Sequence, residues 1–389
     1  MAGPRRVKSF LDEYTRDLTS VDFQRLFTRD TPEAYRYFAR GIDMRGLESK
    51  PWYKRWPIKA RLLFSAFTMR LSPARRVLYG IAVVSVLLGL IVLFRGFGTT
   101  PLLLFPFEIA LPLPQWVDGT LWLVTGFVAL NLLILMEVAD RLSLKGDLEI
   151  ARDIQLAMLP GAMRDTGDVT VAGVTRPANT VGGDFYDILT RPDGRLIVAL
   201  GDVAGKGSPA ALLMALVIAM LRTLVDEGLD AARLVERLNA QVVRHSPASR
   251  FITLFYGVYD PRDGSLEFVN AGHLPPIVRR ADGRMDSAGA PATSGLALGM
   301  FDRATYRTDR TVIEPGDVLV LFSDGITEAE NLAGRPFDEA GIETVLMAQA
   351  DKDPESIGQA ILRAVDAHAG EGRLADDLTA LVLKRAAAS

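Results

Sequence analysis

Two long apolar runs interrupt an otherwise mixed sequence and predict helices that cross a membrane. The first, Val77–Phe94, contains 18 residues without a charge, and the second is Leu121–Met136. At 1.5 Å per residue, runs of this length approach the thickness of the hydrocarbon core of a bilayer. We therefore expect two transmembrane helices, at about 77–94 and 120–138. They lie in a membrane region, residues 77–136, whose external loop is apolar and rich in proline.

The charges that flank these runs predict their orientation. From Arg45 to Arg76 the chain carries nine Lys or Arg residues and one acid, and Arg141 and Lys145 follow the second run. Because positive charges gather at the cytoplasmic ends of membrane helices, both ends of the region should face the cytoplasm, with residues 1–76 as a cytoplasmic N-terminal region. Two buried core helices are the alternative, but they would not explain so uneven a distribution of charge.

A helical pattern follows the second apolar run and ends at Pro160. Mostly apolar residues recur there at spacings of four and three: Leu144, Leu148, Ala151, Gln155 and Met158. This spacing predicts a helix, and we interpret residues 137–161 as a helical regulatory linker. The apolar face is short, so it fits either a coiled coil or packing against the following domain.

Short apolar runs joined by turns fill residues 165–385. Predicted strands are Val169–Thr175, Arg195–Leu200, Ile252–Tyr259, Leu266–Asn270, Pro276–Arg280, Arg310–Glu314, Asp317–Phe322 and Leu378–Leu383. Predicted helices are Ser208–Glu227, Asp230–His245, Asp338–Ala348 and Pro354–His368. Turns such as Pro-Asp-Gly and Ala-Asp-Gly join several strands as hairpins. Hairpins with helices between them predict an α+β domain of antiparallel sheets covered by helices.

Composition narrows the chemistry that this domain can perform. The 389 residues include no cysteine and only three histidines, which excludes thiol chemistry and nearly excludes a histidine-rich metal site. The net charge of −3 gives no sign of nucleic-acid binding. A metal ion in this chain must therefore be held mainly by oxygen atoms, which suits Mg²⁺, Mn²⁺ or Ca²⁺.

Acidic residues stand at the margins of the predicted strands: Asp184, Asp202, Asp324 and the pair Asp376–Asp377. Three of them adjoin a glycine, which lets the backbone turn sharply and approach a ligand closely. Carboxylates gathered at strand ends repel one another, and a divalent cation removes that repulsion. We therefore expect one centre for two Mg²⁺ or Mn²⁺ ions that clamps a phosphoryl group. Simple turn or cap roles are the alternative, which explains one such acid better than four.

The stretch Gly201–Ser208 has the look of a nucleotide-binding loop but lacks its essential residues. A Walker loop needs Ser or Thr directly after the lysine, whereas Gly207 follows Lys206, and Leu200 stands where the first glycine belongs. The pattern therefore argues against nucleotide binding.

Seven motifs occur in order along the chain: IQLAMLP, VGGDFYD, GDVAGKGSPAALLMA, FITLFYGVYD, NAGHLPP, LFSDGITEAEN and DDLTALVL. In these motifs the chain resembles the PPM (PP2C-like) serine/threonine phosphatases of the bacterial RsbU/SpoIIE branch. The resemblance covers about residues 146–385. It implies an α/β/β/α sandwich of two antiparallel sheets flanked by helices, with two Mn²⁺ or Mg²⁺ ions at one end. The phosphatase domain would then be residues 165–385.

The resemblance also implies which residues hold these ions. Asp202 would bridge them, with the carbonyl of Val203 beside it, and Asp324 and Asp376 would complete the shell of the first ion. Asp184 would bind or orient a water molecule at the metals. These four aspartates are the expected catalytic residues.

Other residues of the motifs would support the centre. Asp377 would lie behind the ligands, Lys206 could contact the phosphate or remain a solvated loop lysine, and His273 fits a structural place in the core. Arg176 lies near the position of a phosphate-binding arginine of eukaryotic relatives, although this branch usually lacks that residue. Three glycines would allow close approach of the backbone: Gly183, Gly201 and Gly325.

The implied reaction is hydrolysis of phosphoserine or phosphothreonine on a partner protein, without a phosphoenzyme. In this branch the substrate is usually a STAS-domain anti-sigma factor antagonist, in bacterial stress or developmental signalling. We expect a multi-pass protein of the bacterial inner (cytoplasmic) membrane with its phosphatase domain in the cytoplasm. The linker would pair two protomers as a homodimer and bias the helix Ser208–Glu227, and through it the loop of Asp202.

Two alternatives come from other functional classes. One is a catalytically weak membrane receptor that binds the same partner without turnover, and the other is a transporter or membrane scaffold. Two spans with one strongly polar residue, Asn131, form no evident transport pathway. Hydrolysis of a generic phosphate ester in the presence of Mn²⁺ separates the enzyme from both alternatives.

Overall fold

The structure is a computed structural model of the chain and describes residues 51–387, with gaps at 96, 105–106, 115, 162, 248–249, 290–293 and 371–374. The chain divides into two compact units, Met1–Leu142 and Ser143–Ser389. Residues 1–50 of the predicted N-terminal region lie outside the described part. The finer division into four regions stays a prediction.

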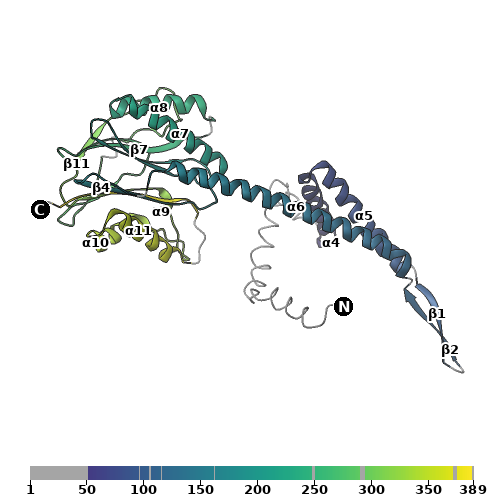
Figure 1. Ribbon diagram of the computed structural model, residues 1–389. Helices are drawn as coiled ribbons and strands as arrows, with labels where there is room; N and C mark the ends of the chain where they lie inside the picture. The colour runs from purple at the N-terminus through teal and green to yellow at the C-terminus, as the bar shows by residue number, and fades with distance from the viewer. Residues whose placement is uncertain are drawn as a thin grey trace, which may run out of the picture. The chain divides into compact units, whose positions relative to one another are not determined.

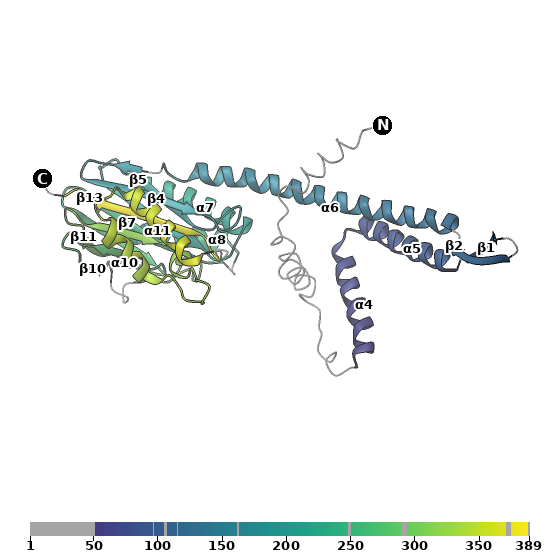
Figure 2. The ribbon, with the colours of Figure 1, turned by 90° about the horizontal axis from the view of Figure 1, so that it is seen from below.

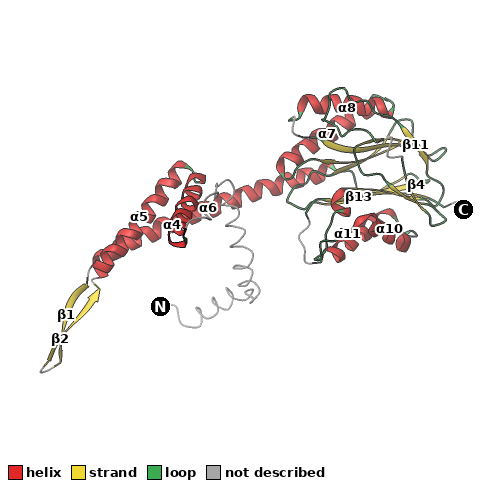
Figure 3. Cartoon of the chain, turned by 180° about the vertical axis from the view of Figure 1, so that it is seen from behind, coloured by secondary structure: helices red, strands yellow, loops and turns green. Residues whose placement is uncertain are grey.

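The first unit consists of helices and one β-hairpin. Helix α4 covers Trp52–Arg70 and α5 covers Pro73–Arg95, and α6 begins at Trp116. Between α5 and α6, strands β1 (Phe97–Leu104) and β2 (Phe107–Pro114) pair antiparallel where we expected an irregular loop (Figure 3). Each strand of a two-stranded sheet keeps one unpaired edge, which explains why the prolines of this segment are tolerated.

Helices α5 and α6 approach each other through small residues. A Cβ atom added to Gly126 would lie 2.6 Å from Val86 Cγ2, and one added to Gly119 would lie 2.9 Å from the carbonyl oxygen of Gly89. Large apolar residues instead point outward. Phe127, for example, has 66% of its surface exposed. Small residues between helices and large apolar residues outside are typical of packing in a lipid environment.

Ionic contacts join the two helices at one end. Arg75, at the start of α5, lies 2.7 Å from Asp140 and 3.4 Å from Glu137, which follow the apolar part of α6. By length and composition, stretches of α5 (Pro73–Leu93) and α6 (Gly119–Met158) are apolar enough to cross a membrane. The ion pairs put the polar ends of both apolar stretches on the same side of this helix pair.

Helix α6 continues without a break through the predicted linker and ends at Met158. The predicted continuity between the second apolar run and the linker is thus confirmed, with Gly146 inside the helix. Within the second unit, Gln155 is buried and Met158 packs against the core, whereas Leu144 is exposed. The C-terminal half of the apolar face therefore packs on the following domain, which is one of the two interpretations that the sequence left open.

Two antiparallel sheets form the centre of the second unit (Figure 1). One has the order β10-β9-β12-β13-β4-β3 and the other β11-β8-β7-β6-β5. The strands are β3 Met163–Asp165, β4 Val169–Arg176, β5 Phe185–Thr190, β6 Leu196–Val203, β7 Ile252–Asp260, β8 Ser265–Ala271, β9 Ile277–Arg279, β10 Met285–Ser287, β11 Asp309–Val312, β12 Val318–Phe322 and β13 Leu378–Arg385.

Helices cover the outer faces of both sheets (Figures 1 and 2). Helices α7 (Ser208–Asp226) and α8 (Ala231–His245) lie on the sheet that contains β6, and α10 (Asp338–Gln349) and α11 (Pro354–Ala369) lie on the sheet that contains β13. A short helix, α9 (Asp324–Thr327), follows β12. The expected sandwich of two antiparallel sheets between helical layers is confirmed.

The core has three layers because each sheet is buried on both faces. Along β6, Ile197 and Ala199 face the cluster under α7 and α8, whereas Leu196, Val198 and Leu200 face the cluster between the sheets. A third cluster lies under α10 and α11. Because successive side chains of a strand point to opposite faces, a strand buried on both faces needs the continuous apolar run seen in this sequence.

Helix α7 is also long and apolar enough to cross a membrane by composition. Its residues Met214, Val217 and Ile218 are fully buried against the sheet and α8, so it belongs to the core of the second unit. The predicted strands and long helices of this unit are present, and β3, β5, β10 and α9 add to them. Strand β5 escaped prediction because Asp187 interrupts its apolar residues. The fold buries this carboxylate and pairs it with Arg222 on α7 at 2.7 Å.

Candidate active site

Antiparallel pairing brings the two Gly-Asp dipeptides to the same edge of one sheet. Strand β5 begins directly after Asp184, and β6 contains Gly201 and Asp202. Phe185 pairs with Gly201, so the next residue along each strand places Asp184 beside Asp202. In the sequence these acids stand 18 positions apart on either side of a turn, and the register of the hairpin makes them neighbours.

Close approaches of the backbone explain the glycines at this edge. A Cβ atom on Gly183 would lie 2.9 Å from the carbonyl oxygen of Val203 and 3.3 Å from Oδ1 of Asp202. One on Gly201 would lie 2.6 Å from the ring of Phe185. Any larger residue would push apart the two strands that carry the acids, so these glycines maintain the approach of Asp184 to Asp202.

The second sheet supplies two further acids. Ser323 directly follows β12. Its backbone N–H donates to the Thr379 carbonyl at 2.9 Å, and its hydroxyl accepts from the Thr379 N–H at 3.0 Å. These bonds fasten β12 to β13, so that Asp324 and Asp376 follow and precede paired strands. A Cβ atom on Gly325 would collide with the carbonyl oxygen of Asp377, which makes glycine necessary at the start of α9.

The pKa shifts show that these carboxylates influence one another. Burial raises the pKa of Asp184 well above its ordinary range, and the carboxylate of Asp202 raises it further. Burial, followed by the charges of Asp324 and Asp376, raises the pKa of Asp202 to about 7. Burial also raises the pKa of Asp324, aided by its acidic neighbours Glu328 and Asp376. Acids from both sheets thus concentrate negative charge at one place.

Asp377 fixes the loop that precedes Asp184. Its Oδ2 atom accepts a hydrogen bond from the Gly183 N–H at 2.7 Å, and its Oδ1 atom accepts from the Ala178 N–H at 2.8 Å. The side chain is almost completely buried. This carboxylate therefore acts on the backbone of the loop, as expected for a residue that lies behind the ligands.

Lys206 pairs with one of the expected ligands. Its Nζ atom lies 2.8 Å from Oδ2 of Asp376 and also donates a hydrogen bond to the Ala375 carbonyl. About half of the lysine side chain is exposed. Arg176 is also engaged, because it forms two hydrogen bonds with Asp366 on α11 at 2.6 and 2.8 Å.

The donor set suits a divalent cation. Among the residues that the structure describes, no three carboxyl or imidazole groups converge closely enough to hold a metal ion. The Oδ2 atom of Asp184 is nevertheless buried without a hydrogen-bond partner in the same set of residues, and its neighbour Asp202 is an acid. An unpartnered buried carboxylate oxygen among like charges is stabilised by a hard cation, so these residues fit one. Asp376 would join these metal-binding residues once its ion pair with Lys206 is broken.

The linker reaches this site through Gln155, for which the sequence pattern predicted only a place on a helix face. Its side chain bonds to both backbone groups of Gly182, at 2.8 and 3.2 Å, next to the Gly183–Asp184 pair. Arg222 of α7 donates to the carbonyl of Met158, the last residue of α6, at 2.7 Å. The sequence feature that could have indicated this contact is the position of a polar residue, Gln155, within a mostly apolar helical face.

His273 occupies the interior beside this edge of the sheet. Its Nδ1 atom lies 3.0 Å from the hydroxyl of Thr253, and the side chain of Asn270 bonds to its backbone N–H and carbonyl. Burial lowers the pKa of His273 to about 4. The imidazole is therefore neutral near pH 7 and has the surroundings of a core residue.

Comparison with known proteins identifies the second unit. Residues 192–386 match the family described as Stage II sporulation protein E (SpoIIE). The chain is 30% identical over 246 residues to the phosphoserine phosphatase RsbU of Bacillus subtilis, which covers 62% of this chain and 71% of RsbU. It is 29% identical over 283 residues to the protein IcfG of Synechocystis, which covers 65% of this chain and 43% of IcfG.

A solved structure has the same fold. The SiaA-PP2C domain of Pseudomonas aeruginosa superposes with a TM-score of 0.54 at 22% identity, covering 63% of this chain and 98% of that domain. The order of the motifs, the two-sheet sandwich and the matched length all indicate the same family. The chain therefore belongs to the SpoIIE family of PP2C-type serine/threonine protein phosphatases.

Proposed function

We propose that this chain is a membrane-anchored, metal-dependent phosphatase that hydrolyses phosphoserine or phosphothreonine on a STAS-type anti-sigma factor antagonist. The observation that carries this proposal is that Asp184 and Asp202 are neighbours in one sheet, and that Asp324 and Asp376 from the other sheet are near enough to act electrostatically on Asp202. Water would be consumed, the phosphorus–oxygen bond to the side chain would break, and inorganic phosphate and a free hydroxyl group would be released.

Some of these residues would hold the metal ions, and others would position the water molecule or the backbone around it. Asp202, Asp324, Asp376 and the Val203 carbonyl would hold two Mn²⁺ or Mg²⁺ ions, and Asp184 would orient a water molecule. When bound, such cations polarise a phosphoryl group and promote ionisation of water. Asp377 supports the arrangement from behind, because it fixes the backbone that presents Asp184.

Membrane attachment rests on the first unit. Its two apolar helices pack through glycines, expose large apolar side chains and carry an ion pair at one end. Basic residues before α5 favour a cytoplasmic location for that end. The phosphatase domain would then work at the cytoplasmic face of a bacterial inner membrane, as a homodimer paired along exposed parts of α6.

RsbU supports the choice of a phosphoprotein substrate, because it is a phosphoserine phosphatase and aligns over most of its length. The deciding experiment incubates the full-length chain and Mn²⁺ with candidate phospho-STAS proteins of the same cell and follows phosphate release. Loss of phosphate from one of them, with no release from an Asp202→Asn variant, is the expected result. No release from any candidate would refute the STAS assignment.

A receptor that binds such a partner without turnover is the second candidate. The ion pair between Lys206 and Asp376 favours it, because this pair withholds one expected ligand. A generic phosphate ester decides between the two, because only an enzyme hydrolyses it with Mn²⁺.

A further inference from the structure

A cavity of about 550 Å³ adjoins the candidate active site. Its lining includes Lys206, Gly325 and Asp376 of the candidate site together with Glu328 and Glu330. Cavities of about 300–1,000 Å³ are the size in which proteins bind small ligands and side chains. A group that enters this space therefore lies next to the carboxylates that would act on a phosphate.

The wall formed by Glu330 and the residues after it is well fixed. The Asn331 side chain accepts hydrogen bonds from the backbone N–H groups of Ala333 and Arg335 at 2.9 and 3.1 Å. His368 of α11 contacts the Arg335 carbonyl through Nε2 at 2.9 Å, and its ring packs edge-on against Phe337. The turn is thus bound both to itself and to α11, which holds Glu330 in place.

The backbone of Glu328 is fixed by the short helix α9. Its backbone N–H donates to the carbonyl of Asp324 at 2.8 Å, so it lies one helical turn from an expected metal ligand. Both Glu328 and Glu330 are exposed. Within the described residues, neither carboxylate forms an ion pair or side-chain hydrogen bond.

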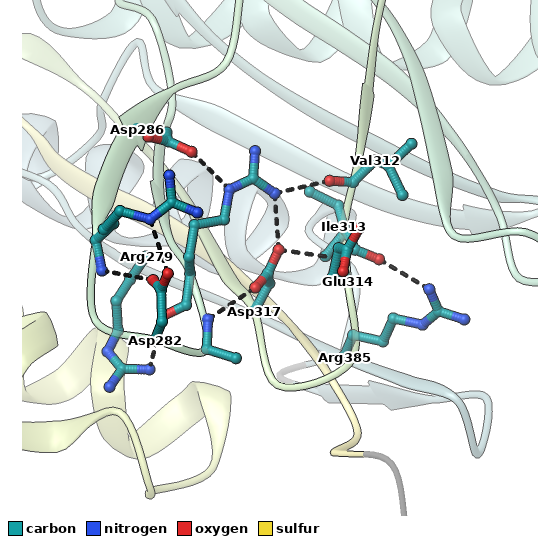
Figure 4. A network of polar contacts seen from close by, with 11 residues as sticks. Arg279, Asp282, Asp286, Val312, Ile313, Glu314, Asp317 and Arg385 are labelled. Atoms are coloured by element: carbon teal, nitrogen blue, oxygen red, sulfur yellow. Dashed lines mark hydrogen bonds and ion pairs between the residues drawn. The ribbon is translucent and has the colours of Figure 1, made fainter.

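A second cavity, of about 490 Å³, shows the opposite arrangement (Figure 4). There Asp286 and Asp317 both pair with Arg280 at 2.7 Å, and Asp282 pairs with Arg284 at the same distance. Asp317 also accepts one hydrogen bond from the backbone N–H of Ala281 at 2.9 Å. Arginines of the chain itself satisfy these acids. Among the residues that the structure describes, the two glutamates beside the active site have no such arginine partner.

We infer that the cavity beside the active site binds a lysine or arginine side chain of the phosphoprotein, a few residues from its phosphoserine, through Glu328 and Glu330. This inference rests on the proposed function. A phosphoserine at the carboxylates of both sheets leaves its neighbouring residues next to the cavity. A cationic side chain there meets two carboxylates and displaces no partner from the described part of the chain. Basic residues beside the phosphoserine are thereby preferred, and acidic residues are repelled.

The test compares two synthetic phosphoserine peptides that differ only in their flanking residues, lysine in one and glutamate in the other. The full-length chain is assayed on both peptides with Mn²⁺, and the ratio of the two kcat/KM values is measured at low and at high salt. Because exposed ion pairs contribute modestly, we expect a roughly threefold to tenfold preference for the lysine peptide that shrinks with salt. The ratio reports recognition independently of the amount of active enzyme.

Two double variants examine the glutamates. Glu328→Gln with Glu330→Gln keeps the size of both side chains and should bring the ratio close to one, and the corresponding double change to lysine should invert it. Glu339→Lys is the matched control, because Glu339 is an exposed acid of α10 outside the cavity lining, and it should keep the wild-type ratio.

The possible outcomes separate this inference from the function on which it rests. A wild-type ratio near one, or a ratio unchanged in both double variants, would overturn the role of the cavity while phosphatase activity stands. An equal loss of preference in Glu339→Lys would overturn it as well, since a general charge effect would then be sufficient. Failure to hydrolyse either peptide or a small phosphate ester would refute both the inference and the proposed function.

Discussion

The side chain of Gln155 and the backbone of Gly182 hold each other through two hydrogen bonds across 27 positions of the chain. Nε2 donates to the Gly182 carbonyl at 2.8 Å, and Oε1 accepts from its N–H at 3.2 Å. Gly182 directly precedes the Gly183–Asp184 pair. The linker helix is therefore bonded to the loop of Asp184. Its predicted influence on the loop of Asp202 through the helix Ser208–Glu227 stays a prediction.

Removal of this side chain should reduce both catalysis and stability. In Gln155→Ala the two polar groups of Gly182 lose their partner, which costs on the order of 1–3 kcal/mol for buried groups and loosens the loop of Asp184. We expect kcat for a phosphate ester with Mn²⁺ to fall at least about tenfold, because each 1.4 kcal/mol of transition-state stabilisation is a factor of ten. Ile154→Ala, an exposed change on the same helix, should leave both kcat and the melting temperature close to wild type. Equal activity of the two variants would show that Gln155 only attaches the linker.

Neutralising the central acids should abolish turnover and preserve the fold. Asp202→Asn and Asp324→Asn each remove an expected ligand and relieve repulsion between buried carboxylates. Because the pKa of Asp202 is raised to about 7, its charged form opposes folding above that pH, and the loss of the charge should stabilise the metal-free domain by up to a few kcal/mol. Thermal unfolding in a chelator at pH 8 measures this gain. Near-normal Mn²⁺-dependent turnover in either variant would remove the assignment of a two-metal centre.

Lys206 should compete with metal for Asp376. In Lys206→Met the carboxylate is no longer held by the ion pair at 2.8 Å, so less Mn²⁺ should be needed for half-maximal turnover. Lys206→Arg keeps the charge and should keep the wild-type requirement. An unchanged Mn²⁺ requirement in Lys206→Met, together with a higher KM for the phosphorylated substrate, would instead favour contact between Lys206 and the phosphate.

His273 should make the fold sensitive to acid. Its folded pKa of about 4 lies below the ordinary value of about 6.5, so the unfolded chain binds a proton at higher pH than the folded chain does. Its contribution is therefore fully present above pH 6.5 and falls by about 1.4 kcal/mol per pH unit as the pH decreases toward 4. We expect urea unfolding to show a smaller loss of stability between pH 7 and pH 5 in His273→Gln than in the wild type. The aspartates of the active site titrate in both proteins, so the difference isolates the histidine, and parallel pH profiles would contradict its role.

Reporter fusions should place both ends of the membrane region in the cytoplasm. The ion pair of Arg75 with Asp140 and the basic residues before α5 give both ends the character of a cytoplasmic surface. A cytoplasm-active reporter should work when fused before residue 1 or after residue 389, and a periplasm-active reporter should work when inserted in the β1–β2 hairpin. The reverse pattern would invert the topology, and cytoplasmic activity at all three positions would exclude a membrane-spanning arrangement.

Much of the architecture was predictable because it depends on local patterns. The uninterrupted apolar stretch of β6 is typical of a strand buried on both faces, and the structure buries it between two clusters. The pattern also shows its limits. Strand β5 was not predicted, because Asp187 interrupts its apolar residues. A buried acid is acceptable in this strand only because its carboxylate pairs with Arg222 of α7. The apolar composition of α7 equally fits a membrane helix, and only its burial against the sheet and its neighbour α8 makes it a core helix.

By itself, the sequence determined which residue types are available: a histidine-poor, cysteine-free chain with acids beside glycines at strand margins. Only the tertiary structure decided which of them meet. The antiparallel register of β5 and β6 brings Asp184 beside Asp202, and the linker helix brings Gln155 to Gly182. Strand and helix periodicity are properties of neighbouring residues, whereas such contacts depend on how distant segments pack around a common core. The register was the deciding factor, because a shift of one residue along β5 would turn its side chains to the opposite face and separate the two acids.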